Sequence, residues 1–251
     1  MKHKFTFIES KLDNTRNNNI NNDNRIKINN SNDFPYCAIG LLKLYFNYNT
    51  ISYRTGFLIK ENVVLTAGHN IFDSRLNPNK KNEILGKPLK IEFYCGLNNN
   101  ESEFKQFESE KFFYDNENLN EDYGIIIFDE KISDKFIEIK EFDKNLDGRV
   151  FNVAGYPINK AIKDNNNNNI IFNLYEGKGG ILSYNFNSGI ISTNIKSSYG
   201  QSGSGLIYYD NNEKKYYCVG IHVASNVLEN EFYSTMITKK RIEMIKKWIE
   251  N

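Results

Sequence analysis

The chain has 251 residues, and its 32 Lys and Arg nearly balance its 31 Asp and Glu, which gives a formal net charge of +1 at pH 7. A chain of this length can bury a hydrophobic core without disulfides or metals. Because no excess of basic side chains is present to bind a phosphate backbone or an anionic bilayer, the composition argues against a nucleic-acid or membrane partner.

Polar residues dominate the N-terminus. Residues 1–19 end in three consecutive asparagines and contain no apolar run long enough for the core of a signal peptide. No stretch of about 18 apolar residues occurs anywhere else in the chain. We therefore expect residues 1–19 to form a disordered tail or a pro-segment. We also expect a soluble protein, with the cytoplasm favoured over export and the compartment otherwise open.

Short apolar runs, rich in β-branched and aromatic residues, follow one another along the rest of the chain. Gly, Asn and Asp separate the runs, which span residues 37–46, 55–68, 89–95, 123–128, 149–156, 179–186, 189–195, 204–209 and 216–224. Runs of this length, bounded by turn residues, indicate an all-β sandwich or barrel rather than alternating strands and helices.

The three cysteines, Cys37, Cys95 and Cys218, are odd in number and far apart in the sequence. This pattern fits neither a disulfide framework nor paired metal ligands, so we interpret the cysteines as small buried side chains. We expect no metal and no other cofactor.

A single helix is predicted at the C-terminus, over residues 238–251. Thr238 is a suitable N-cap, and the helix would carry its apolar residues on one face, with Lys and Arg on the other. The members of the apolar stripe are Ile242, Ile245, Trp248 and Ile249. We interpret this stripe as the face that packs on the rest of the protein.

Two of the three histidines come at the end of an apolar run, so each would lie at the end of a strand. His69 follows VVLTAG, and His222 follows YYCVGI. A single histidine at a strand end is more often structural than catalytic, so each of them needs support from other residues. Asp122, just before YGIIIF, and Ser202, in YGQSGSG, provide that support.

These residues contain the chemistry for nucleophilic catalysis. A serine hydroxyl is a weak nucleophile at neutral pH, and it needs an imidazole to accept its proton and a carboxylate to orient that imidazole. The chain presents these groups in the order His69, Asp122, Ser202. The glycines beside Ser202 allow a tight turn whose N–H groups can point at one position, as an oxyanion hole requires.

The segments TAGH, DYGIIIF, GQSGSG and VGIH make the chain resemble the trypsin-fold serine proteases over residues 20–251. The order of His, Asp and Ser is that of chymotrypsin-like enzymes and differs from the orders in α/β-hydrolases and subtilisins. Within this fold the sequence is similar to the glutamyl-endopeptidase, or V8-like, branch. Gln201 and Gly205 replace the asparagine and the proline of that family's usual GNSGSP motif.

The resemblance implies an all-β, chymotrypsin-like fold of two antiparallel six-stranded β-barrels followed by a C-terminal helix. The first barrel would span residues 20–140, the second residues 141–237, and the helix residues 238–251. The active site would lie in the cleft between the two barrels.

By the same resemblance, Ser202 would be the nucleophile, His69 the general base and Asp122 the residue that orients the base. The first barrel would supply His69 and Asp122, and the second would supply Ser202. The N–H groups of Gly200 and Ser202 would form the oxyanion hole. We therefore expect a serine endopeptidase that acts on polypeptide substrates as a monomer.

The similarity to glutamyl endopeptidases also implies a preference for Glu, and less for Asp, on the acyl side of the cleaved bond. His222 would lie at the substrate pocket, with Ser197 as a second donor and Ser225 as a third. Trypsins carry an aspartate six residues before the nucleophile, but Lys196 occupies that position here, so a basic substrate side chain would meet no counter-charge. The alternative for His222 is a core histidine beside a broad apolar pocket.

Two other functions remain open on the sequence alone. The chain could be a trypsin-fold protein that binds peptides without cleaving them, which a lost triad member or a distorted oxyanion turn would indicate. It could also be an unrelated all-β interaction domain, in which case His69, Asp122 and Ser202 would lie far apart. Within the protease function, a different specificity on the acyl side is the alternative.

Overall fold

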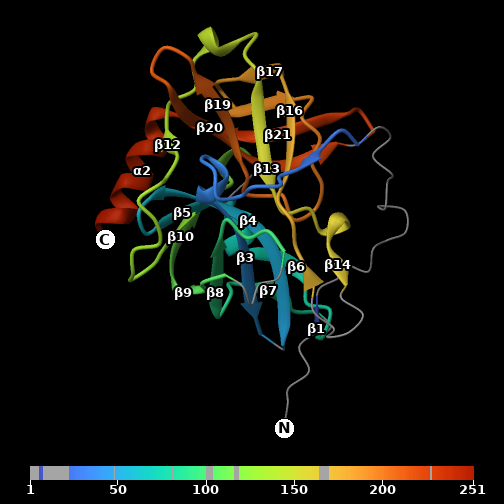
Figure 1. The fold of residues 1–251 in the computed structure, drawn as a ribbon. Helices are drawn as coiled ribbons and strands as arrows, with labels where there is room; N and C mark the ends of the chain where they lie inside the picture. Colours follow the sequence, from blue (N-terminus) through green and yellow to red (C-terminus); the bar gives the residue numbers. More distant parts are fainter. Residues whose placement is uncertain are drawn as a thin grey trace.

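Figure 1 presents the computed structural model, which describes residues 6–7, 23–47, 49–80, 82–99, 104–115, 119–163, 170–226 and 228–251. The expected tail or pro-segment, residues 1–19, lies outside the described residues apart from the short strand Thr6–Phe7. Short strands joined by turns make up two large curled sheets, one in the lower half of the view and one in the upper half.

The first sheet has eight strands in the described part of the chain, in the order β10-β11-β5-β4-β3-β8-β9, with β1 paired to β4. Its strands are β1 (Thr6–Phe7), β3 (Ile39–Phe46), β4 (Thr50–Lys60), β5 (Val63–Thr66), β8 (Lys90–Cys95), β9 (Phe107–Ser109), β10 (Lys111–Asp115) and β11 (Tyr123–Ile127). Neighbouring strands are antiparallel, except that β1 runs parallel to β4.

The second sheet has nine strands among the described residues, in the order β17-β18-β21-β20-β19-β13-β16-β2, with β12 paired in parallel to β20. Its strands are β2 (Ile26–Lys27), β12 (Glu138–Ile139), β13 (Phe151–Gly155), β16 (Tyr175–Gly179), β17 (Ile181–Asn185), β18 (Ile190–Thr193), β19 (Gly205–Asp210), β20 (Lys215–Asn226) and β21 (Glu231–Met236). The other pairings in this sheet are antiparallel.

Smaller elements lie outside the two large sheets. Two short hairpins pair β6 (Asp73–Leu76) with β7 (Ile84–Gly86) and β14 (Ile162–Lys163) with β15 (Ile170–Ile171). The helical turns are η1 (Tyr36–Ala38), α1 (Gly68–Ile71), η3 (Leu119–Glu121), η4 (Lys144–Leu146) and η5 (Ile158–Lys160), and the longer helix is α2 (Lys239–Glu250).

The all-β fold with a C-terminal helix expected from the sequence is confirmed. The sheets contain more than the six strands expected for each barrel, in part because two-residue strands such as β1, β2 and β12 extend them. Strands β2 and β12 join the second sheet although both lie before residue 141. The boundaries between the two barrels therefore stay a prediction.

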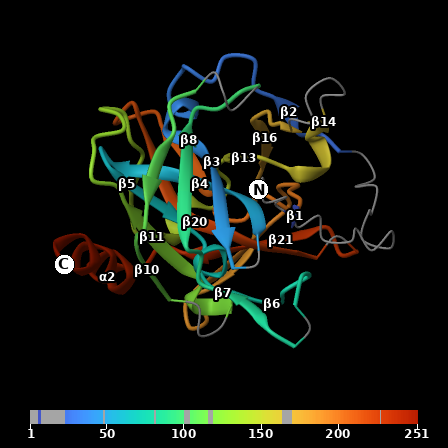
Figure 2. The same ribbon diagram turned by 90° about the horizontal axis from the view of Figure 1, so that it is seen from below.

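A shared core joins the sheets. β4 is buried at every residue except its last, because its strand neighbours and the second sheet cover it. The larger apolar cluster contains residues of both sheets, whereas the smaller one lies within the second sheet. Figure 2, seen from below, places β3, β4 and β8 in front of the strands of the second sheet. The two sheets therefore pack on a common core.

Helix α2 packs against the first sheet, as its apolar stripe predicts. Thr238 caps the helix by accepting the N–H of Arg241 at 3.4 Å. Ile245 is buried, and the Trp248 ring lies 5.3 Å from the ring of Tyr123 on β11. Within the described ranges no helix, α2 included, is long and apolar enough to cross a membrane.

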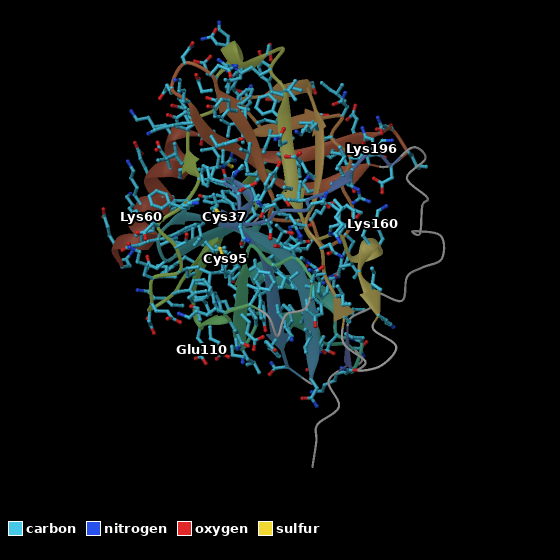
Figure 3. All side chains as sticks on the ribbon, viewed as in Figure 1. Cys37, Lys60, Cys95, Glu110, Lys160 and Lys196 are labelled. Atoms are coloured by element: carbon cyan, nitrogen blue, oxygen red, sulfur yellow. The ribbon has the colours of Figure 1, made fainter. Side chains whose placement is uncertain are left out.

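All three cysteines are free thiols. Cys218 is buried, and Cys37 and Cys95, both labelled in Figure 3, are partly buried. Burial raises the pKa of the Cys95 and Cys218 thiols to about 12, so both stay protonated and unreactive at neutral pH.

Candidate active site

Strand pairing brings His69 and Asp122 together. β5 ends at Thr66, and α1 begins two residues later with His69 in its only turn. Asp122 immediately precedes β11, which runs antiparallel to β5 with Gly124 opposite Thr66. In an antiparallel pair, the end of one strand meets the start of the other, so this register places the carboxylate beside the imidazole.

Both carboxylate oxygens of Asp122 interact with His69. Oδ2 lies 2.6 Å from ring atom Nδ1, and Oδ1 accepts the backbone N–H of His69 at 2.8 Å. Asp122 is buried, whereas the side chain of His69 is 35% exposed. Because two donors fix the carboxylate, the imidazole keeps Nδ1 on Asp122 and presents Nε2 on its other side.

Ser202 lies in a tight turn between two glycines with positive φ angles. These angles are +97° at Gly200 and +91° at Gly203. A Cβ atom at Gly200 would lie 2.3 Å from the carbonyl oxygen of Tyr156, and one at Gly203 would lie 2.2 Å from that of Thr55. Both the backbone angles and the available space therefore require glycine on each side of the serine.

Hydrogen bonds from the first sheet hold this turn next to His69. The Thr55 N–H donates to the Ser202 carbonyl at 3.2 Å, and Asn70 Nδ2 donates to the same oxygen at 2.9 Å. Asn70 follows His69 directly in the chain, so the serine turn and the imidazole share one site. Among the described residues, the Ser202 hydroxyl makes no hydrogen bond to His69.

The N–H groups of Gly200 and Ser202 are the candidate oxyanion donors. The carbonyl of Tyr199 accepts the N–H of Ile158 at 2.9 Å, so the N–H of the same trans peptide, that of Gly200, points the opposite way. The Gly200 carbonyl in turn accepts from Thr55 Oγ1 at 2.8 Å. Across the described ranges, neither candidate N–H donates to an acceptor of the protein, so both are available to a bound oxygen.

His222 and Ser197 form a hydrogen-bonded pair next to the serine turn. Ser197 Oγ lies 2.7 Å from His222 Nε2, and both residues are buried. The Gly203 N–H donates to the His222 carbonyl at 2.8 Å, which joins the pair to the serine turn. Ser225, three residues further along β20, is exposed and makes no hydrogen bond to either of them in the described part of the chain.

Burial controls the protonation of His222. Removal from water is the main reason that the pKa of His222 is lowered to about 4; the neighbouring His69 acts in the same direction, and a hydrogen bond with the backbone of Tyr233 opposes both. The imidazole of His222 is therefore neutral at pH 7.

Sequence reasoning did not identify a second group of side chains at the serine turn. The guanidinium of Arg54 lies 4.2 Å from the ring centroid of Tyr199 and donates to its hydroxyl at 2.7 Å. Burial would raise the pKa of Tyr199, but Arg54 and Arg75 together lower it. Arg25 contacts the same turn through Gln201. No local motif marks these residues, since each partner lies more than a hundred positions away.

A family model described as Trypsin matches residues 46–249. The matched range includes His69, Asp122 and Ser202 but not Arg25. No curated protein matches the chain closely enough to count as a relative.

The structure is similar to those of solved proteases. A Glu endopeptidase in complex with MPD superposes with a TM-score of 0.68 at 22% identity, over 89% of this chain and 95% of that one. The thermostable serine protease AL20 from an extremophilic microorganism gives 0.60 at 15% identity, over 83% and 95%. Protease Anisep from Arthrobacter nicotinovorans gives 0.59 at 12% identity, over 86% and 96%. At these identities the likeness is one of fold, and the chymotrypsin-like arrangement expected from the sequence is confirmed.

Proposed function

Because the chain belongs to the trypsin family of serine proteases, we propose that it is a serine endopeptidase that cleaves polypeptides through an acyl-enzyme on Ser202. His69 is the general base, Asp122 orients it, and the N–H groups of Gly200 and Ser202 bind the oxyanion. The observation that carries the proposal is the buried carboxylate of Asp122, which binds both Nδ1 and the backbone N–H of His69 beside the serine turn.

The proposed reaction follows from these positions. Ser202 Oγ attacks the scissile carbonyl carbon as its proton passes to His69 Nε2, and the carbonyl oxygen becomes an oxyanion held by the two N–H groups. His69 then gives the proton to the leaving amine, the C–N bond breaks, and an ester remains on Ser202. A water molecule attacks this ester with His69 again as base, which releases the acid and restores the serine.

Labelling with a fluorophosphonate probe tests the proposal, because the probe needs an activated serine together with an oxyanion hole. We expect stoichiometric labelling of the wild-type protein at Ser202, mapped by peptide mass spectrometry. His69→Ala and heat-denatured wild-type protein should stay unlabelled. Labelling of a different residue, or labelling that persists in His69→Ala, would rule out this triad.

We further propose that the enzyme prefers Glu over other residues on the acyl side of the cleaved bond. A carboxylate that enters a pocket loses its hydration, at a cost of several kcal/mol unless donors replace the water. His222 and Ser197 support this preference, because they form a buried hydrogen-bonded pair directly behind the serine turn. Ser225 remains a third, more exposed candidate donor.

The selectivity for Glu should depend on His222. With matched peptides that carry Glu or the neutral, isosteric Gln before the cleaved bond, we expect His222→Ala to lower the ratio of kcat/KM values about 10- to 100-fold, the size of a charge-assisted hydrogen bond. If His222 is instead a core histidine, His222→Ala will reduce stability while the ratio stays as in the wild type. Rapid cleavage after Lys, Arg or Phe would also contradict the acidic preference.

The same selectivity should fall as the pH rises. His222 is neutral in the free protein, with a pKa of about 4, and a substrate carboxylate beside it favours the protonated ring, so the pKa of His222 rises on binding. Binding of Glu then takes up a proton, and it weakens as the pH increases through the raised pKa. We expect the Glu to Gln ratio of kcat/KM to decline between pH 5 and 9, a ratio in which pH effects common to both substrates cancel. A flat ratio would mean that His222 stays neutral in the complex.

A further inference from the structure

The segment before β2 buries a guanidinium against the turn that carries Ser202. The side chain of Arg25 is 0% exposed, and a buried cation is stable only when it is paired and hydrogen-bonded. Asp23 provides the pairing, since its two oxygens accept from Nε at 2.9 Å and from Nη2 at 2.8 Å. This forked arrangement fixes the orientation of the guanidinium plane.

The third nitrogen of Arg25 contacts the serine turn itself. Nη1 donates to Ser198 Oγ at 2.6 Å and to Gln201 Oε1 at 2.6 Å. Gln201 is fully buried, and its Oε1 also accepts the N–H of Ser198 at 3.0 Å. The Gln201 side chain therefore folds back onto the start of the turn, where Arg25 holds it.

We propose that Arg25 is a positioning residue for the oxyanion hole, an inference that rests on the proposed function. The N–H of Ser202 belongs to the peptide between Gln201 and Ser202, so the backbone angles of Gln201 set its direction. In the described part of the chain, Gln201 Nε2 has no hydrogen-bond partner, so Oε1 alone fixes the side chain. Loss of Arg25 removes one of the two donors to this oxygen, and the Ser202 N–H is then less firmly directed at the oxyanion.

Geometry rather than charge accounts for this role. Asp23 neutralises the guanidinium at contact distance and also pairs with Lys160 at 3.0 Å. Arg25, and to a lesser extent Lys160, hold the pKa of the Asp23 carboxyl well below its usual range, so the pair stays ionised at working pH. A neutralised pair exerts little field on the oxyanion, whereas a missing hydrogen bond leaves the Gln201 oxygen buried and under-satisfied.

The position of Arg25 has a consequence for maturation. The cation that binds Gln201 is a side chain within the chain, not the amine of a chain terminus. Cleavage upstream of Asp23 therefore adds no group that this contact needs. The hydrogen bond from Arg25 to Gln201 should therefore form whether or not residues 1–19 are removed.

Arg25→Met and Lys160→Met form a matched pair for the test. Each variant removes one positively charged partner of Asp23, but only Arg25→Met also removes the hydrogen bond to Gln201. Lys160 is labelled in Figure 3. We expect Arg25→Met to lower kcat about 10- to 100-fold with KM unchanged, less than the 10²- to 10³-fold loss for an oxyanion donor removed outright. Its affinity for a peptide aldehyde, which forms a tetrahedral oxyanion on the serine, should fall by the same factor. Lys160→Met should match the wild type in both measurements.

Gln201→Met provides an independent measurement, since it keeps the pair of Arg25 with Asp23 intact. We expect it to lower kcat as much as Arg25→Met, and the double variant to show no additional loss, because both act through one contact. If Arg25→Met does not fold, the kcat of Gln201→Met tests the proposal in its place. A wild-type kcat in Gln201→Met overturns the proposal. Additive losses, or equal kcat values in Arg25→Met and Lys160→Met, overturn it as well.

Fluorophosphonate labelling of the intact chain separates this inference from the proposed function. Mass spectrometry should find the label at Ser202 in the wild-type protein, and turnover of the same preparation without the probe is then compared with that of Arg25→Met. If no wild-type chain is labelled, the proposed function fails. If wild-type enzyme is labelled but turns over no faster than Arg25→Met, the role of Arg25 is wrong while the protease function stands.

Discussion

Ser202→Ala is expected to lower kcat about 10⁶-fold, with KM and the thermal unfolding midpoint close to those of the wild type. The variant lacks the nucleophile, so no acyl-enzyme can form. The oxyanion donors and the substrate-binding residues remain, and they leave only the residual acceleration typical of a triad without its serine. The turn itself should persist, because its shape depends on Gly200 and Gly203 rather than on the serine hydroxyl.

Ser204→Ala is the matched control for this substitution. It removes a hydroxyl from the same turn, two residues away, and that hydroxyl is buried with no hydrogen-bond partner among the described residues. We expect it to change kcat by no more than a few-fold. His69→Ala should cost about as much as Ser202→Ala, and the double variant no more than either, because the two residues act as a unit.

Purified variants are compared by the initial rate of peptide cleavage, with active-site titration of the wild type to set the enzyme concentration. A repurification step removes contaminating host protease, which would otherwise limit the measurable loss. Cleavage by Ser202→Ala at the wild-type rate would exclude Ser202 as the nucleophile. A large, equal loss in Ser204→Ala would show that the turn, and not the nucleophile, had been disturbed.

The candidate site could be located from the sequence because its chemistry lies in short segments. His69 follows a buried strand within three residues, and Asp122 comes directly before another. Gly200 and Gly203 have positive φ angles, in agreement with the tight turn that the glycines beside Ser202 predicted. Each feature is set by a few neighbouring residues, so it is visible without knowledge of the sheet order.

The contacts that stabilise the site were beyond reach of the sequence, because they join distant segments. Arg25 reaches Gln201 across 176 positions, and Arg54 reaches Tyr199 across 145. The pairing of β2 with β16 carries the first of these contacts, yet a two-residue strand leaves almost no periodic pattern. Tertiary packing alone decides which arginine is buried, because an arginine without a recognisable partner in the sequence is expected at the surface.

Asp122→Asn is expected to lower kcat about 10⁴-fold while it preserves the fold. The structure explains why so small a change should have so large an effect. Oδ1 of Asp122 accepts the backbone N–H of His69, and Oδ2 faces ring atom Nδ1. In the variant, the backbone N–H of His69 still needs an acceptor, so the amide oxygen must take the place of Oδ1. The amide NH₂ group then takes the place of Oδ2 and faces Nδ1.

An NH₂ group at Nδ1 requires that ring atom to be an acceptor, which moves the proton of the neutral imidazole to Nε2. Nε2 then has no lone pair with which to take the proton of Ser202, and the imidazolium that forms during catalysis loses its counter-charge. We expect kcat and the rate of fluorophosphonate labelling to fall together, with KM unchanged. Asp129→Asn makes the same chemical change at an exposed position beyond the other end of β11 and should retain wild-type activity. If Asp122→Asn stays within tenfold of the wild type, the pair of Asp122 and His69 is structural, and another group must orient the base.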